Sequence, residues 1–113
     1  MRWLLVCGLC ALAGIAPQAA TGAAPRSCGR VVNPYPDTRY DGVDLRRIRA
    51  TGVSCHRARQ VARKAHRKAL RLTPPPGGVR HIRWHGWQVT GDIRPRTYRY
   101  VAKRDGKRVS WLF

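Results

Sequence analysis

The chain has 113 residues, the length of a single domain, and its 23 Lys and Arg against five acids give a formal net charge of +18. All five acids are Asp, so the sequence offers no Glu for a paired-carboxylate hydrolase and no EF-hand calcium loop. A basic excess of this size favours a negatively charged partner.

Residues 1–23 have the organisation of a secretory signal peptide. Arg2 provides the charged start, residues 4–16 form an apolar core of 13 residues, and Thr21 and Ala23 favour cleavage after Ala23, with Ala20 as a second position. An uncleaved anchor is the alternative, but the core is too short to cross a bilayer. We therefore expect a secreted, monomeric protein of residues 24–113, a single small domain in which only Arg2 has been lost from the charges.

The cysteines divide between the signal peptide and the mature chain. Cys7 and Cys10 have CxxC spacing but lie within the expected signal, where they act only as small apolar residues. Cys28 and Cys55 remain, and in an oxidising compartment we expect them to form one disulfide that stabilises the fold by roughly 3 to 4 kcal/mol. A free reactive thiol or an intermolecular bridge is the alternative.

The first half of the mature chain predicts two extended segments and a helix. Residues 28–40 contain a short strand followed by a proline-broken loop, and residues 43–51 form a second extended stretch. Ser54 is placed to cap a helix over residues 55–72. The helix carries an apolar stripe of Cys55, Ala58, Val61, Ala62, Ala65, Ala69 and Leu72. Its opposite side is basic and comprises Arg57, Arg59, Arg63, Lys64, Arg67, Lys68 and Arg71.

After the proline-rich linker 73–78 the hydrophobic period changes from 3.6 to 2. We expect one strand over residues 79–90 with a bulge at Gly86, a second over residues 96–103, and a third over residues 109–113 after a turn at Asp105-Gly106. The predicted fold is α+β in the order β-β-α-β-β-β, with one amphipathic helix packed on a small, mostly antiparallel sheet and one disulfide.

Short motifs spread along the mature chain carry a family resemblance. They are Cys28-Gly29, the run 50–61 around Ser54-Cys55, Gly86-Trp87 and the closing Arg104-Asp105-Gly106-Lys107. The chain resembles a group of small secreted, functionally uncharacterised proteins of high-GC Gram-positive bacteria. Members of that group often carry a second cysteine pair, and the resemblance places Val89 and the neighbourhood of Tyr100 where those cysteines would fall. The resemblance therefore implies that aromatic packing replaces a second bridge here.

The basic helix side is the predicted binding site. We expect Arg57, Arg63, Lys64, Arg67, Lys68 and Arg71 to bind an anionic polymer or membrane surface, such as a wall polymer, a phospholipid headgroup or nucleic acid. A solvated helix face rich in Arg through base composition is the alternative, since Arg outnumbers Lys 19 to 4. The basic and aromatic residues that alternate near Trp84, Trp87 and Tyr100 could form a nucleic-acid platform. We favour core packing for these aromatics, because strand alternation places aromatics and arginines on opposite faces.

The four histidines do not indicate a catalytic or metal site. His81 and His85 have the spacing of a zinc pair on a helix, but on a strand their rings would lie about 13 Å apart. We expect no enzyme activity, no cofactor and no metal, and a non-enzymatic protein that binds polyanions. The alternatives are a membrane-active antimicrobial protein, a secreted metal-independent ribonuclease and an inhibitor of a foreign protease.

Overall fold

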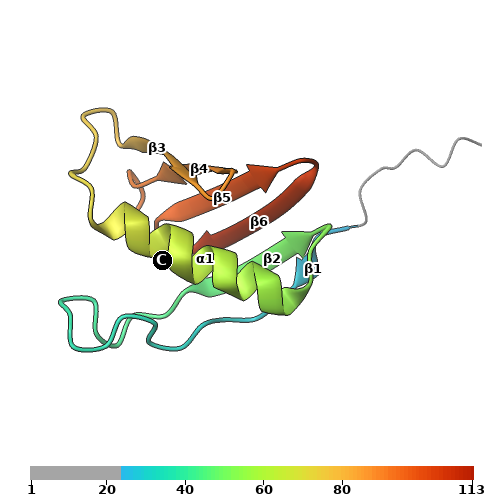
Figure 1. The fold of residues 1–113 in the computed structure, drawn as a ribbon. Helices are drawn as coiled ribbons and strands as arrows, with labels where there is room; N and C mark the ends of the chain where they lie inside the picture. Colours follow the sequence, from blue (N-terminus) through green and yellow to red (C-terminus); the bar gives the residue numbers. More distant parts are fainter. Residues whose placement is uncertain (1–23) are drawn as a thin grey trace, which may run out of the picture.

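A computed structural model describes residues 24–113, and the predicted signal peptide and its cleavage site lie outside the described residues. Six strands form one antiparallel sheet in the order β1-β2-β6-β5-β4-β3. A single helix lies across one face of this sheet (Figure 1). The elements are β1 (Arg26–Ser27), β2 (Arg46–Thr51), α1 (Cys55–Leu70), β3 (Val79–Trp84), β4 (Trp87–Asp92), β5 (Arg99–Arg104) and β6 (Lys107–Leu112). The predicted α+β class and the helix-on-sheet architecture are confirmed.

The helix begins where the sequence predicts it. The Ser54 hydroxyl accepts a hydrogen bond from the Arg57 amide at 3.1 Å, which satisfies one of the free donors of the first turn. The Ala-rich side of α1 packs against alternate residues of the strands and forms the core with them. The most completely buried side chains of this core include Val61, Leu45, Ile48, Val89, Val109, Trp87 and Trp111.

The disulfide between Cys28 and Cys55 is confirmed, with Cα atoms 5.1 Å apart. It joins the first residue of α1 to the segment that follows β1. The Cys28 amide also donates to the carbonyl of Ile48 at 2.7 Å, so the bridge ties the start of α1 to β2 as well. The long loop between β1 and β2 then returns along the helix, where the Tyr35 hydroxyl donates to the Arg63 carbonyl at 2.7 Å.

Three predictions from the sequence are wrong in detail. The first strand, expected within residues 28–40, is Arg26–Ser27, and residues 28–40 contain only the isolated bridge of Val31 with Leu45. The single strand predicted over 79–90 is a hairpin of β3 and β4, and His85 and Gly86 form its two-residue turn with φ of 46° and 79°. The sheet therefore has four strands after the helix, and Gly86 is a turn residue rather than a bulge. Leu72 was expected on the buried stripe but is 44% exposed, because α1 ends at Leu70 ahead of the prolines.

Aromatic stacking holds the C-terminal hairpins together. Tyr100 of β5 and Trp111 of β6 lie opposite each other, with ring centroids 5.5 Å apart and planes 3° from parallel. Gly91 of β4 is opposite Tyr100 on its other side and leaves room for the ring. Val89 is buried opposite Ala102. The aromatic residues that we expected in the core are therefore buried at Trp87, Tyr100 and Trp111, whereas Tyr98 is 36% exposed.

Candidate functional site

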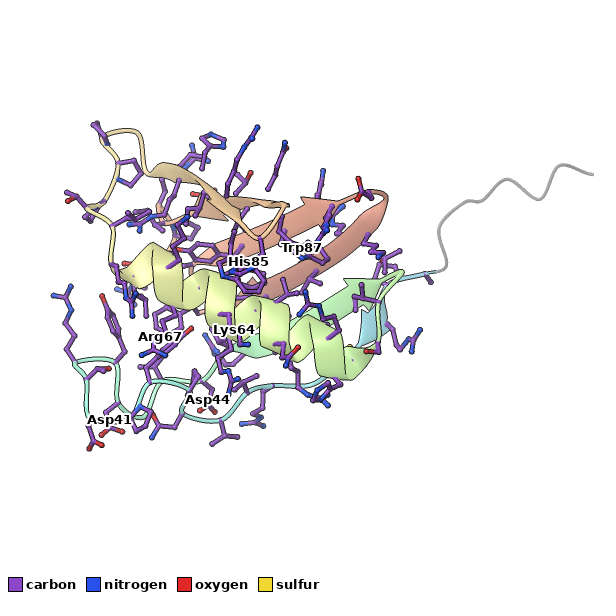
Figure 2. The ribbon with its side chains drawn as sticks, viewed as in Figure 1. Asp41, Asp44, Lys64, Arg67, His85 and Trp87 are labelled. Carbon is purple, nitrogen blue, oxygen red and sulfur yellow. A yellow bond between two sulfur atoms is a disulfide. The ribbon has the colours of Figure 1, made fainter. Side chains whose placement is uncertain are left out.

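The outer side of α1 presents the predicted basic residues to solvent. Arg63, Lys64, Arg67, Lys68 and Arg71 are exposed, and Arg57 is half-buried. Lys64 and Arg67 both extend from the side of the helix away from the sheet (Figure 2). The alternation of buried Ala with exposed Arg and Lys every three to four residues produces this arrangement.

Hydrogen bonds divide the basic side into structural and unengaged residues. Arg57 donates to the Gln60 side chain at 3.2 Å, and Lys68 donates to the Arg83 carbonyl of β3 at 2.6 Å. Arg59 donates to the Cys28 carbonyl at 3.2 Å. Among residues 24–113, the side chains of Lys64, Arg67 and Arg71 make no hydrogen bond or ion pair. The exposed Arg63 side chain makes none within these residues either, so Arg63, Lys64, Arg67 and Arg71 are the part of the predicted site that is available to a ligand.

Carboxylates are placed away from this unengaged group. Within the described part of the chain the ion pairs are Arg30–Asp44, Arg94–Asp92 and Arg104–Asp105, and none involves α1. Three of the acids, Asp37, Asp41 and Asp44, lie in the loop before β2, where Asp41 and Asp44 accept hydrogen bonds that fix the loop. This loop borders one flank of the helix (Figure 2). The basic side is thus bounded by acids on one flank and lacks them along its length.

Tyr35 anchors the acidic loop beneath the helix. Its ring is 6% exposed, and its hydroxyl is held by the Arg63 carbonyl. Burial raises the pKa of this hydroxyl well above its usual value, although the charges of Arg63 and Arg67 oppose the change. Tyr35 is therefore a neutral structural contact.

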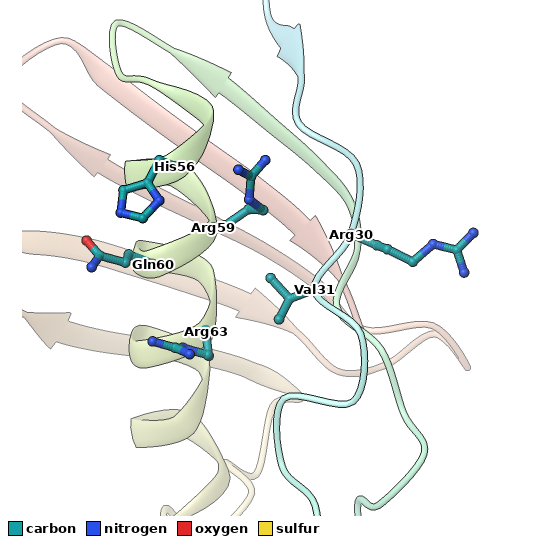
Figure 3. Close-up of a pocket in the computed structure, with 6 residues that line it drawn as sticks. All are labelled: Arg30, Val31, His56, Arg59, Gln60 and Arg63. Atoms are coloured by element: carbon teal, nitrogen blue, oxygen red, sulfur yellow. The ribbon is translucent and has the colours of Figure 1, made fainter.

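A shallow cleft of about 290 Å³ lies between α1 and the segment after β1. His56, Arg59, Gln60 and Arg63 line it from the helix, and Val31 lines it from the loop (Figure 3). Arg30, on the loop side, extends away from the helix in this view and makes its ion pair with Asp44 at 3.5 Å. Since Arg59 is also committed to a backbone carbonyl, the cleft does not gather its arginines around one point.

The histidines do not converge on a common site. His66 of α1 is fully buried and accepts a hydrogen bond from Trp111. The other three are exposed, with His56 in the first turn of α1, His81 on β3 and His85 in the β3–β4 turn. His85 packs against Trp84, with ring centroids 4.5 Å apart. Within residues 24–113 no group of three or more His, Cys, Asp or Glu is arranged to hold a metal ion. Over the same residues, no helix has the length and apolar character needed to cross a membrane.

A second basic surface, on the sheet face away from α1, was missed from the sequence. It comprises Arg47, Arg49, Arg83, Arg99, Lys103 and Arg108, all exposed. Strand alternation already placed arginines opposite the aromatic residues. This surface was not predicted because the single helix had not been recognised to cover only one face of the sheet. The face that carries the arginines is therefore open (Figure 1).

No protein-family model matches the chain, and no curated protein or solved structure is significantly similar to it. The charges and contacts of these surfaces are therefore the features that bear on function.

Proposed function

We propose that the mature chain is an exported, non-enzymatic protein that binds anionic polymers through the outer side of α1. The observation that carries this proposal is the group of exposed, unengaged cations at Arg63, Lys64, Arg67 and Arg71 on a helix without acidic residues. Export is inferred from the signal-like residues 1–23.

Part of the charge on α1 is unfavourable to the helix, which supports a role outside folding, although the helix dipole favours Arg67 and Lys68 in the last turn. Lys64 and Lys68 are four residues apart, as are Arg63, Arg67 and Arg71, and such like-charge pairs each destabilise a helix by about 0.2 to 0.5 kcal/mol. Arg57 and Arg59 lie near the helix N-terminus, where the helix dipole disfavours cations. A bound polyanion would relieve both effects.

Two alternative functions have less support. A membrane-active helix needs an accessible apolar side, whereas the apolar side of α1 is buried against the sheet at Ala58, Val61, Ala62, Ala65 and Ala69. A metal-independent ribonuclease needs an acid and a base within reach of one phosphate, whereas His66 is buried and the exposed His56, His81 and His85 lie on α1, on β3 and in the β3–β4 turn. We therefore retain binding as the proposed function.

The test is a salt titration of binding to a fluorescent polyanion, comparing the mature wild-type protein with Lys64→Gln/Arg67→Gln/Arg71→Gln. The slope of log affinity against log salt should fall by about 2 to 3, because each lost phosphate contact removes about one released counterion. The matched control is Arg26→Gln/Arg39→Gln/Arg96→Gln, which removes the same charge from exposed positions outside both basic surfaces. An equal fall in both variants would reject α1 as the binding site.

A further inference from the structure

The open face of the sheet combines uncovered area with dense positive charge. Trp87, Tyr100 and Trp111 point to the α1 side and are buried. The face opposite to them spans β2 to β3, about 19 Å at roughly 4.8 Å between neighbouring strands. Its exposed cations come from four strands and are Arg47, Arg49, Arg83, Arg99, Lys103 and Arg108.

The strand register brings several of these cations close together. Arg108 of β6 is directly opposite Lys103 of β5, and like charges in such a pair destabilise a sheet. Arg49 of β2 is opposite Ser110, which is itself opposite Val101 of β5. Small and half-buried side chains therefore separate the cations, and no large side chain covers them.

A bulge in β2 turns one more arginine onto this face. The register between β2 and β6 shifts between Arg46 and Arg49, and Arg47 has a φ of 48°, a left-handed conformation that costs about 1 kcal/mol or more for a residue other than Gly. Arg47, Arg49, Arg99 and Arg108 line a shallow hollow of about 430 Å³, whose floor includes Val101 and Leu112. At this bulge Ile48 enters the core and pairs with Cys28 and Gly29, and Arg47 joins Arg49 and Arg99 around the hollow.

One carboxylate shares this face, and it is already neutralised. Asp92 of β4 is opposite Arg99 and accepts two hydrogen bonds of 2.9 Å from the Arg94 side chain. These bonds hold the pKa of Asp92 down at about 2. Among the described residues, the remaining acids lie in the loop before β2 or in the β5–β6 turn. The cations of the open face are thus left without compensating carboxylates.

We propose that the open sheet face is a second binding surface, and that its ligand is a linear phosphodiester polymer without nucleobases. Five of the six cations are Arg, whose planar fork of donors matches phosphate oxygens. Proteins that bind single-stranded nucleic acid add aromatic rings on which bases stack. The aromatic rings of β4, β5 and β6 all lie on the helix side. This face can therefore bind phosphate groups but has no ring from these strands on which a base could stack.

The two basic surfaces lie on opposite sides of the molecule. The outer side of α1 faces away from the sheet, and the open face lies behind it (Figure 1). One protein molecule can therefore hold two polymer chains and bridge them. The bridge, unlike the open-face site itself, rests on the function proposed for α1.

The first experiment measures binding of fluorescent poly(glycerol phosphate) by anisotropy over a range of salt. Arg49→Gln/Arg99→Gln/Arg108→Gln should lower the salt slope by about 2 to 3, whereas the control Arg26→Gln/Arg39→Gln/Arg96→Gln should change it by less than about 1. Unchanged far-UV circular dichroism and thermal midpoint check that each variant is folded. A sheet variant that behaves like the control overturns the open-face site.

The same assay separates this site from the one on α1 and identifies the polymer. If the sheet variant loses slope and the α1 variant Lys64→Gln/Arg67→Gln/Arg71→Gln does not, the open face stands and the proposed function of α1 fails. The wild-type protein should bind poly(glycerol phosphate) within about threefold of an oligothymidylate of equal charge. Tighter binding of the oligothymidylate by tenfold or more, as base stacking gives, overturns the base-free ligand in favour of single-stranded nucleic acid.

The second experiment tests bridging directly. One poly(glycerol phosphate) chain is fixed to beads, and capture of a second, fluorescent chain is measured as protein is added. The wild-type and control proteins should capture the second chain, and either the sheet variant or the α1 variant should lose most of the capture. Capture that persists in the sheet variant, or fails in the wild-type protein, overturns the bridge.

Discussion

The indole nitrogen of Trp111 donates a hydrogen bond to Nδ1 of His66 across 3.0 Å in the interior of the protein. The imidazole also contacts Phe113 and Tyr100, with ring centroids 4.1 and 4.6 Å away. Because Nδ1 accepts, His66 is neutral with its proton on Nε2, which has no hydrogen-bond partner within the described residues. Burial, aided by the charge of Arg80, lowers the pKa of His66 from 6.5 to about 3.

This pairing predicts that the protein loses stability in mild acid. Between pH 6.5 and pH 3 the unfolded chain binds a proton at His66 that the folded chain does not, so the free energy of unfolding falls as the pH falls. At pH 5 the loss relative to pH 7.5 should be about 2 kcal/mol. Urea unfolding followed by tryptophan fluorescence at a series of pH values measures it.

The matched control is His66→Gln, which keeps an acceptor for Trp111 but cannot titrate. Its free energy of unfolding should change little between pH 7.5 and pH 5. Asp92 does not affect this comparison between pH 7.5 and pH 5. Its pKa in the folded protein is about 2, below the usual 3.8, so its contribution to stability is lost only as the pH falls from about 3.8 towards 2. A wild-type protein equally stable at pH 7.5 and pH 5 would contradict the neutral, buried His66.

Arg80 of β3 caps the end of α1 from the sheet. Arg80 is 8% exposed, and its guanidinium donates to the carbonyls of Ala69 and Leu72 at the end of the helix, where the Ala69 carbonyl also accepts from the Leu72 amide. Arg80→Met should lower the free energy of unfolding by about 2 kcal/mol, because both carbonyls lose a hydrogen bond from a charged donor. It should also raise the pKa of His66, since the repelling charge is gone, and the His66 ring resonance in an NMR titration reports this. A destabilised variant with an unmoved His66 pKa would contradict the electrostatic link.

The sequence predicted the features that local rules determine. The Ser54 cap, the Ala-rich stripe, the Cys28–Cys55 bridge and the Asp105-Gly106 turn follow from residue type and spacing alone. His66 lies just outside the angular range of the predicted stripe and was not placed on it, because its burial depends on Trp111 and Arg80, which are distant in sequence. His85-Gly86 gave no turn signal because the dipeptides that mark a two-residue hairpin turn are Asn-Gly, Asp-Gly and Gly-Gly.

The binding surfaces show the same division. The basic side of α1 was predicted from helical spacing, whereas the engagement of Lys68 by the Arg83 carbonyl depends on where β3 packs. Predicting the open sheet face requires knowing that the fold has only two layers, and no local sequence pattern gives the number of layers. A sheet covered on both faces would have buried Val101 and Leu112 and excluded the neighbouring arginines.

Gly91 should tolerate no larger residue. A Cβ at this position would overlap the Tyr100 ring, with Cζ only 2.8 Å away, and the ring is held on its other side by Trp111. Gly91→Ala should lower the free energy of unfolding by about 2 to 3 kcal/mol through overpacking. Thr90→Ala, on the exposed face of the same strand, is the control and should change it by less than about 0.5 kcal/mol. Urea unfolding compares the two, and equal effects would show that the Tyr100 ring moves freely.

Lys64→Glu should move stability and binding in opposite directions. The new carboxylate would lie four residues before Lys68, the favourable orientation for an ion pair on a helix, and would also remove a repulsive pair. The free energy of unfolding should therefore rise by about 0.5 kcal/mol. The same change places a negative charge among the unengaged cations of α1, so the affinity for a polyanion should fall by more than for Lys64→Gln. Thermal unfolding and the anisotropy titration measure the two effects on one protein. Stronger folding without weaker binding would mean that Lys64 is a solvated surface residue and that α1 binds its ligand elsewhere.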